Sequence, residues 1–401
     1  MLKRNEAAVV ARERAEGSES ARIFATVSFT FICYLTVGLP LAVIPPFVHD
    51  RLGYGAVLAG LSISVQYAAT VLSRSQVGQM ADTLGAKLTV LRGLVACGVA
   101  GIFVLVAALA VEIHGASLGF LLASRLALGV GESLVGTGAI AWAIGSVGPH
   151  QTARVISWNG IATYGALALG APLGVLLAAQ FGFESVGIVT ILLGVLGFVL
   201  ARRRTPSPIL EEKKLDFRAV LGRVVPYGTV LALGATGFGV IGSFITLFYR
   251  SRDWSGAAFS LSMFGLFFVA ARVLFANSIN RYGGFRVAIL SLSVECLGLV
   301  TLWYAASPIA AMVGAALTGF GFALVFPSLG VVAIGRVPPQ NRGAAIGVYS
   351  VFADIALGIT GPVAGFAAGH FTYAAPFMFG AIATALGVTL TMGLYLRERL
   401  A

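Results

Sequence analysis

Charged side chains are scarce in this chain. Only 11% of the 401 residues are Asp, Glu, Lys or Arg, whereas 58% are hydrophobic and the mean hydropathy is +0.92. A soluble protein of this length could not cover so much apolar surface with so few polar groups. The shortage of charge therefore excludes a soluble globular protein and predicts an all-α membrane protein.

Cysteine and histidine are also few. The three cysteines (Cys33, Cys97 and Cys296) all fall in apolar segments, so we expect packing side chains and no disulfide. The four histidines lie at the ends of apolar segments, without the spacing of a metal site: His49, His114, His150 and His370.

Sequence motifs of catalysis are missing as well. The chain has no G-x-x-x-x-G-K-S/T loop for ATP and no nucleophile elbow. An ATP-driven pump is therefore not expected from this chain, and a membrane-embedded enzyme is only a distant alternative. We expect no enzymatic activity and no cofactor.

Twelve apolar segments of about 18 residues or more are present, and each is long enough to cross the bilayer as a helix. We expect them at 22–48, 55–80, 87–110, 117–146, 154–180, 185–202, 224–249, 256–280, 287–306, 309–335, 344–369 and 374–396. The predicted domains are a polar tail without a cleavable signal peptide (1–21), a six-helix bundle (22–202), a linker (203–223) and a second six-helix bundle (224–401).

Basic residues are distributed unevenly about these spans. Of the 27 Lys and Arg residues, 21 fall on the side of the two termini and three in the opposite loops, Arg51, Arg250 and Arg252. Positive loops face the cytoplasm. We therefore expect a multi-pass protein of the bacterial inner membrane with both termini cytoplasmic. The net charge of +11 then reflects topology, and we expect no nucleic-acid partner.

The two halves of the chain contain an internal repeat. With an offset of 198 residues Arg74 aligns with Arg272 and Gly85 with Gly283; with an offset of 190, Gly129 aligns with Gly319. Two six-helix halves in the same orientation are related by a pseudo-two-fold axis along the membrane normal. This architecture suits alternating access around a site between the halves.

The segment "GQMADTLGAK" (78–87) is a polar island after the second span. Its Gly78, Asp82, Gly85 and Lys87 resemble the G-x-x-x-D-x-x-G-x-K/R signature of the major facilitator superfamily. The second half keeps a partial copy, namely Ala276, Asn280, Gly283 and Arg286. The resemblance covers essentially the whole chain and implies a secondary transporter.

The resemblance also implies a role for this island. Asp82 at the end of the second span can accept hydrogen bonds from the N-terminal amides of a neighbouring helix. The family relation implies that this contact latches the two halves together while the site faces outward. Gly78 would let a helix pack closely, and Gly85 would permit the tight turn. The alternative is a plain polar turn.

Two further segments resemble family motifs. "RLALGVG" (125–131) resembles the Arg-bearing motif of proton-coupled members, and "GALALGAPLG" (165–174) resembles the antiporter motif. The second departs from the pattern, because Ala171 stands before Pro172. The similar subgroup is the YhhS/YfcJ-like, arabinose-efflux-type set of transporters.

Three charged residues inside the spans are candidates for proton coupling. A charge in mid-bilayer costs roughly 3 kcal/mol or more, so each needs a reason. Glu132 lies near the middle of span four, and Arg125 lies about two turns earlier on nearly the same face. Asp354 lies near the middle of span eleven, and its repeat partner is Tyr164. A structural ion pair is the alternative for both carboxylates.

Other polar residues in the spans have weaker assignments. The candidate cavity groups are Gln66, Asn159, Tyr164, Ser243, Thr246 and Ser328. Pro40, Pro172 and Pro362 are expected to bend their helices. Arg74 and Arg272 could line the inner mouth or cap helix ends. The family resemblance implies that the helix of Glu295 lies outside the cavity, so a structural or cytoplasm-linked bond is favoured for it.

These observations lead to one functional hypothesis with an alternative. We expect a monomeric secondary transporter in the lipid bilayer that exports a small organic solute in exchange for protons. The alternative is a proton symporter or facilitator for uptake. Arg125 hints at an anionic or zwitterionic cargo.

Overall fold

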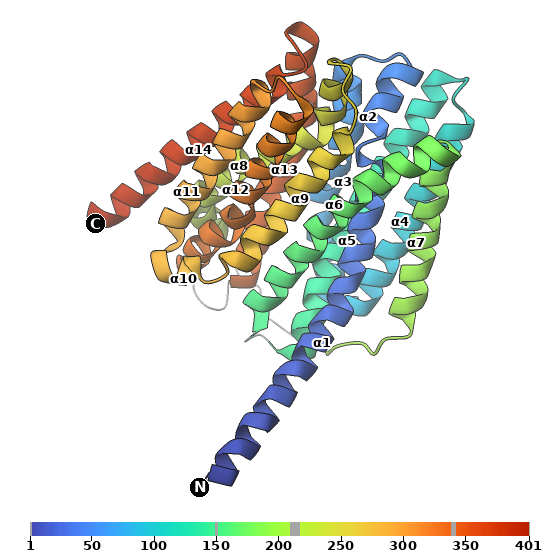
Figure 1. Ribbon diagram of the computed structural model, residues 1–401. Coiled ribbons are helices and arrows are strands. Elements are labelled where there is room, and N and C mark those ends of the chain that lie inside the picture. The colour runs from blue at the N-terminus through green and yellow to red at the C-terminus, as the bar shows by residue number, and fades with distance from the viewer. Residues whose placement is uncertain (1, 149–150, 209–216, 338–341, 401) are drawn as a thin grey trace.

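The computed structural model describes residues 2–148, 151–208, 217–337 and 342–400, and the regular elements of this part of the chain are all helices (Figure 1). The first half contains α1 (Leu2–Leu41), α2 (Ile44–Pro46), the π-helical turn η1 (Phe47–Arg51), α3 (Ala56–Leu84), α4 (Ala86–Leu109), α5 (His114–Val147), α6 (Thr152–Phe181) and α7 (Glu184–Arg202). The second half contains α8 (Phe217–Arg250), α9 (Ala257–Leu274), α10 (Ser278–Tyr282), α11 (Gly284–Trp303), α12 (Pro308–Gly335), α13 (Arg342–His370) and α14 (Ala375–Leu400).

Within the described residues, 12 helical segments are long and apolar enough to cross a membrane, which confirms the expected number. One expected boundary is wrong. The span predicted over 256–280 is interrupted, because α9 ends at Leu274 and the short α10 begins at Ser278. The polar side chains of Asn277 and Ser278 favour helix ends over helix interiors, because they compete for backbone hydrogen bonds. Helix α1 also begins at Leu2 and so includes the segment that we expected as a tail.

The first span changes its helical geometry near its prolines. Helix α1 ends at Leu41, directly after Pro40, and the Val43 amide then donates to the Pro40 carbonyl over 3.1 Å. Pro45 and Pro46 form most of the short α2, which leads into η1. A proline has no amide hydrogen and clashes with the preceding turn. Pro172 and Pro362 lie inside α6 and α13, where bends stay predictions.

The two halves lie side by side in Figure 1, coloured from blue to green and from yellow to red. They contact each other mainly through two helix pairs, α3 with α13 and α6 with α9. The repeat relates α3 to α9 and α6 to α13, so the two pairs are equivalents of each other. Small residues allow the close approach: a side chain at Gly60 would meet the main chain of Gly361, and one at Gly265 would meet Ala168.

The halves are joined at the end of the bundle opposite the chain termini. There Asp50 forms an ion pair with Arg250, and the Tyr373 hydroxyl lies 3.0 Å from His49 Nε2. Burial raises the pKa of the Tyr373 phenol. At the terminal end, by contrast, the side chain of Asp82 is exposed. The two halves are therefore linked by side-chain contacts at the end opposite the termini.

Single-cysteine labelling from outside intact cells tests the orientation. In a background without Cys33, Cys97 and Cys296, cysteines placed at the exposed positions Gly115, Arg252 and His370, in or next to the loops of the opposite end, should react with a membrane-impermeant maleimide. Those placed at Ser207 and Arg204 should react only after lysis, because positive loops face the cytoplasm. Ser207 is half-buried against Gly145, so the exposed Arg204 is the sharper site. Gln340, a further predicted cytoplasmic site, lies outside the described residues.

External labelling of Arg204→Cys before lysis would reverse the predicted orientation. Labelling of the Gly115→Cys variant in a parallel sample of intact cells is the control for access of the reagent.

Candidate functional site

A hydrogen-bonded network surrounds Glu132 in the first half. The carboxylate is buried in α5 and accepts two hydrogen bonds from other helices. The Tyr34 hydroxyl of α1 donates to Oε1 over 2.8 Å, and the Gln66 amide of α3 donates to Oε2 over 2.6 Å. Both donors are neutral, so they satisfy the carboxylate without neutralising its charge. Gln66 was a predicted cavity residue, whereas Tyr34 was not predicted.

Arg125 is connected to this network through Gln66. Its Nη2 donates to Gln66 Oε1, so one amide side chain bridges the arginine and Glu132. The predicted separation of two helical turns is thus spanned by a residue of another helix. Arg125 is 1% exposed, and its Nε and Nη1 have no partner among the described residues. Two buried donors of Arg125 therefore lack a hydrogen-bond acceptor, and leaving donors of a charged group unsatisfied costs free energy.

Asp354 lies in the seam between the halves and pairs with Arg74. Arg74 Nε of α3 donates to Asp354 Oδ2 of α13 over 2.6 Å, and Nη2 contacts the same oxygen. The Asp354 side chain is 9% exposed and that of Arg74 is 27% exposed. The ion pair therefore bridges the two halves in a partly dehydrated position. The sequence is compatible with two roles for Arg74, lining the inner mouth or capping a helix end, and this ion pair is a third.

The remaining predicted cavity residues do not form one cluster. Asn159 Oδ1 in α6 accepts a hydrogen bond from the Thr30 hydroxyl of α1 over 2.7 Å. The Ser328 hydroxyl donates to the carbonyl of Val325 in its own helix. Thr246 Oγ1 in α8 is buried with no partner in the described part of the chain, and Ser243 is buried in the same helix.

Tyr164 lies in a cluster of aromatic rings contributed by the second half. Its ring stacks on that of Phe268 with centroids 3.7 Å apart. Three more rings surround it at 5.7 to 6.1 Å, those of Phe238, Phe264 and Phe322. Arg272 is placed beside the cluster, with its guanidinium carbon 4.9 Å from the Phe268 ring centre. Only Tyr164 was predicted, because phenylalanines in a span are indistinguishable from ordinary packing residues.

The polar island after the second span lies at the terminal end of the bundle. Gly85 follows α3 with a φ of 91°, a conformation that favours glycine. Lys87 Nζ donates to the carbonyl of Arg202 over 2.9 Å, where the C-terminal carbonyls of α7 attract a cation. Around Gly78 there is open space, and Asp82 has no hydrogen bond to any residue that the structure describes. The predicted latch contact is thus not formed in this structure, in which the halves are linked at the other end, and it stays a prediction.

Glu295 is buried away from the seam. It is 0% exposed in α11, and neither carboxyl oxygen has a partner among the described residues. A side chain at Gly237 of α8 would overlap it. The structural bond favoured by sequence analysis is therefore not present.

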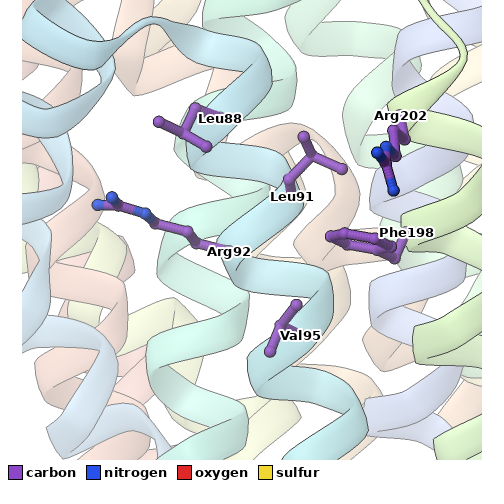
Figure 2. A pocket seen from close by; sticks show the side chains of 6 residues that line it. All are labelled: Leu88, Leu91, Arg92, Val95, Phe198 and Arg202. Atoms are coloured by element: carbon purple, nitrogen blue, oxygen red, sulfur yellow. The ribbon is translucent and has the colours of Figure 1, made fainter.

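The groove drawn in Figure 2 lies apart from these residues, between α4 and α7. It has a volume of about 310 Å³ and an apolar lining, and Arg92 extends away from Phe198 in this view. Arg92 Nη1 instead lies 2.9 Å from Met80 Sδ of α3. Across the described residues, no group of three or more His, Cys, Asp or Glu side chains could hold a metal ion.

Twelve membrane-crossing helices in two equivalent halves, with buried charged groups at their seam, define a polytopic membrane transporter. The chain belongs to the Major Facilitator Superfamily, whose family model matches residues 26–286 and 227–400. This family consists of secondary transporters, not enzymes, and its members typically need no cofactor.

Relatives and solved structures agree with this assignment. The chain is 56% identical over 385 residues to an uncharacterised MFS-type transporter of Burkholderia mallei (strain SAVP1), covering 96% of this chain and 95% of that one. It is 54% identical over 392 residues to another from Pseudomonas aeruginosa (strain UCBPP-PA14), covering 97% of each. The fold is similar to the human organic anion transporter MFSD10 (TM-score 0.69, 17% identity, 93% and 99% coverage). It is also similar to a D-xylose-proton symporter (TM-score 0.74, 16% identity, 91% and 97% coverage).

A double-mutant cycle on Arg74 and Asp354 tests the bridge between the halves. Arg74→Gln and Asp354→Asn should each lower the thermal stability of the purified protein, because each leaves a partly buried charge without its partner. The double variant should be more stable than the sum of the two losses predicts, with a coupling energy of about 1–3 kcal/mol.

Arg203→Gln, at an exposed arginine beyond α7, is the control and should change the stability little. Strictly additive effects of the two single substitutions would mean that the ion pair contributes nothing to holding the halves together.

Proposed function

We propose that this chain exports a small organic solute in exchange for protons. The observation that carries the proposal is the network of Glu132, Gln66 and Arg125 beside the Arg74–Asp354 ion pair. We also propose that the two six-helix domains are residues 22–202 and 224–401. The subgroup that we propose is the arabinose-efflux-type set of transporters.

Glu132 is the better candidate for the proton carrier. In the described part of the chain it has no cationic partner within ion-pair distance, whereas Asp354 is paired with Arg74. Protonation of Glu132 would place a hydrogen on one of its two oxygens, each of which now accepts a hydrogen bond. At least one of the bonds from Tyr34 and Gln66 would then weaken, and the change would reach α1 and α3.

The same network offers a route to exchange. Gln66 cannot reorient toward a protonated Glu132 without changing its contact with Arg125. Arg125 would then present its free donors to an anionic or zwitterionic solute. Proton and solute would each favour a different arrangement of one network, which is the minimal requirement for coupled exchange.

The proposed orientation assigns each end of the bundle to one side of the membrane. With both termini in the cytoplasm of a bacterium, the joined end with Asp50 and Arg250 is periplasmic. The described conformation, with the halves linked at the periplasmic end, is the one that we assign to solute loading from the cytoplasm. The protein acts in the inner membrane as a monomer. Uptake by symport remains the alternative, and the fold similarity to a D-xylose-proton symporter is compatible with it.

Substitution of Glu132 tests the coupling in proteoliposomes with an imposed pH gradient. Glu132→Gln keeps the size of the side chain but cannot exchange a proton. It should abolish gradient-driven flux across a panel of organic solutes while substrate binding and solute–solute exchange persist. Glu112→Gln, at an exposed loop residue, is the matched control and should transport normally.

Asp354→Asn resolves the remaining cases. If it loses gradient-driven transport while Glu132→Gln retains it, the two roles are reversed. If both variants stay coupled, neither carboxylate is the carrier, and Glu295 becomes the next residue to test. Import of the solute with protons in the same direction would replace the export proposal by symport.

The latch makes a separate prediction. We expect Asp82→Asn to weaken the outward-facing state by about 1–2 kcal/mol, because it removes a charge-assisted contact with a helix N-terminus. Transport should fall while insertion and folding are unchanged. Spin labels at the exposed, repeat-related Leu84 and Tyr282 should report a longer mean distance between the two halves.

Asp253→Asn, at an exposed residue of the opposite end, controls for loss of an acidic charge. Unaltered transport together with unaltered label distances in Asp82→Asn would reject the latch in favour of a plain polar turn.

A further inference from the structure

The seam between the halves is asymmetric in its chemistry. The repeat relates Arg74 to Arg272 and Asp354 to Tyr164. At one interface Arg74 meets the carboxylate of Asp354. At the equivalent interface, between α6 and α9, the guanidinium of Arg272 lies against Gly160 of α6, about one turn before Tyr164 in the same helix. Among the described residues, the second arginine therefore reaches the seam without meeting a carboxylate.

Arg272 is a buried cation without a counter-charge. It is 8% exposed, and in the described residues no carboxylate lies within ion-pair distance of it. Its Nε donates to the Ala323 carbonyl over 3.1 Å, which leaves Nη1 and Nη2 without a hydrogen-bond acceptor there. Gly160 of α6 leaves the space for Nη1, because any side chain at that position would overlap it. The last turn of α9, the Ala323 carbonyl and the Phe268 ring stabilise this charge only in part, and a buried arginine without a carboxylate points to a function.

The aromatic cluster beside Arg272 surrounds the position of one ring, and we call this position the seat. Phe238, Phe264, Phe268 and Phe322 come from three helices of the second half and are all buried. The ring that they surround, that of Tyr164, belongs to the first half. Stacked and edge-on contacts of this kind favour an aromatic ring over an aliphatic group. Separation of the halves at α6 and α9 would empty this seat.

We propose that this seat binds an aromatic carboxylate, the ring replacing that of Tyr164 on Phe268 and the carboxylate pairing with Arg272. A single small molecule then supplies both the ring that fills the cluster and the missing negative charge. A planar guanidinium with free donors suits a carboxylate well. This inference rests on the proposed transport function, of which it names the substrate class, and it places the carboxylate of the solute on Arg272 in place of Arg125.

Competition between Tyr164 and the substrate would link binding to the movement of the halves. While Tyr164 occupies the seat, the two halves are in contact at α6 and α9. A ligand in the seat excludes Tyr164 and so favours the arrangement in which α6 has moved away. Binding energy is thereby directed to one conformation, as alternating access requires.

Equilibrium binding to the purified full-length protein tests the assignment. Benzoate, titrated calorimetrically, is the probe; cyclohexanecarboxylate tests the need for a ring, and benzylamine tests the sign of the charge. We expect benzoate to bind and the other two to bind weakly or not at all. Arg272→Gln should weaken benzoate binding about tenfold or more, because a charged hydrogen-bonded pair is lost.

Two further variants keep the test decisive if Arg272→Gln does not fold. Arg272→Lys retains the charge without the planar fork and should have intermediate affinity. Tyr164→Ala removes the competing ring and should bind benzoate more tightly than the unmodified protein. Arg252→Gln is the matched control: its guanidinium also lies over a ring, 5.9 Å from Phe248, but in an exposed loop at the opposite end. Its affinity should be unchanged.

Absence of benzoate binding, unaltered binding in Arg272→Gln, or weaker binding in Tyr164→Ala would each overturn the proposal. These outcomes are separable from failure of the coupling mechanism, because the titration involves no gradient. If benzoate binds but its transport does not respond to the pH gradient, the binding site is supported and the proton coupling is rejected. If other solutes are transported by the gradient but benzoate does not bind, the coupling is supported and the binding site is rejected.

Discussion

The ion pair between Arg74 and Asp354 is the interaction on which the seam between the two halves depends. A charge in a membrane interior is costly without a partner, and the partner of each of these two residues belongs to the other half of the molecule. The halves are thus held at mid-height by a contact that a change of hydration or of partner can release. A transporter requires such a contact to be stable enough to define a state and weak enough to be left.

The network of Glu132 differs in kind, because it is contained within the first half. Tyr34, Gln66 and Arg125 come from α1, α3 and α5, which pack together without the second half. Helix α3 contributes both Gln66 to this network and Arg74 to the seam. A change in protonation of Glu132 therefore has a direct mechanical route to the ion pair, about two turns along one helix.

Much of the fold was predictable from the sequence because lipid imposes a length and a composition on each helix. The twelve spans and the two equivalent halves follow from that constraint. The break between α9 and α10 does not, because it depends on a few polar residues whose effect disappears in a mean hydropathy taken over a whole span. The buried positions of Arg125, Glu132 and Asp354 were predictable for the same reason. Their partners were not. Arg74 contacts Asp354 across 280 residues of chain, and Tyr34 contacts Glu132 across 98.

The repeat supplies what local sequence patterns lack. It makes Arg74 and Arg272 equivalents of each other, and the comparison then gives meaning to the difference between Asp354 and Tyr164. A carboxylate from the protein closes one seam, and at the other seam the protein provides only a ring. A solute that supplies the missing charge at the second seam, as we propose, would bind one arrangement of the halves more tightly than the other. That difference in affinity is what allows a solute to select the conformation of a symmetric scaffold.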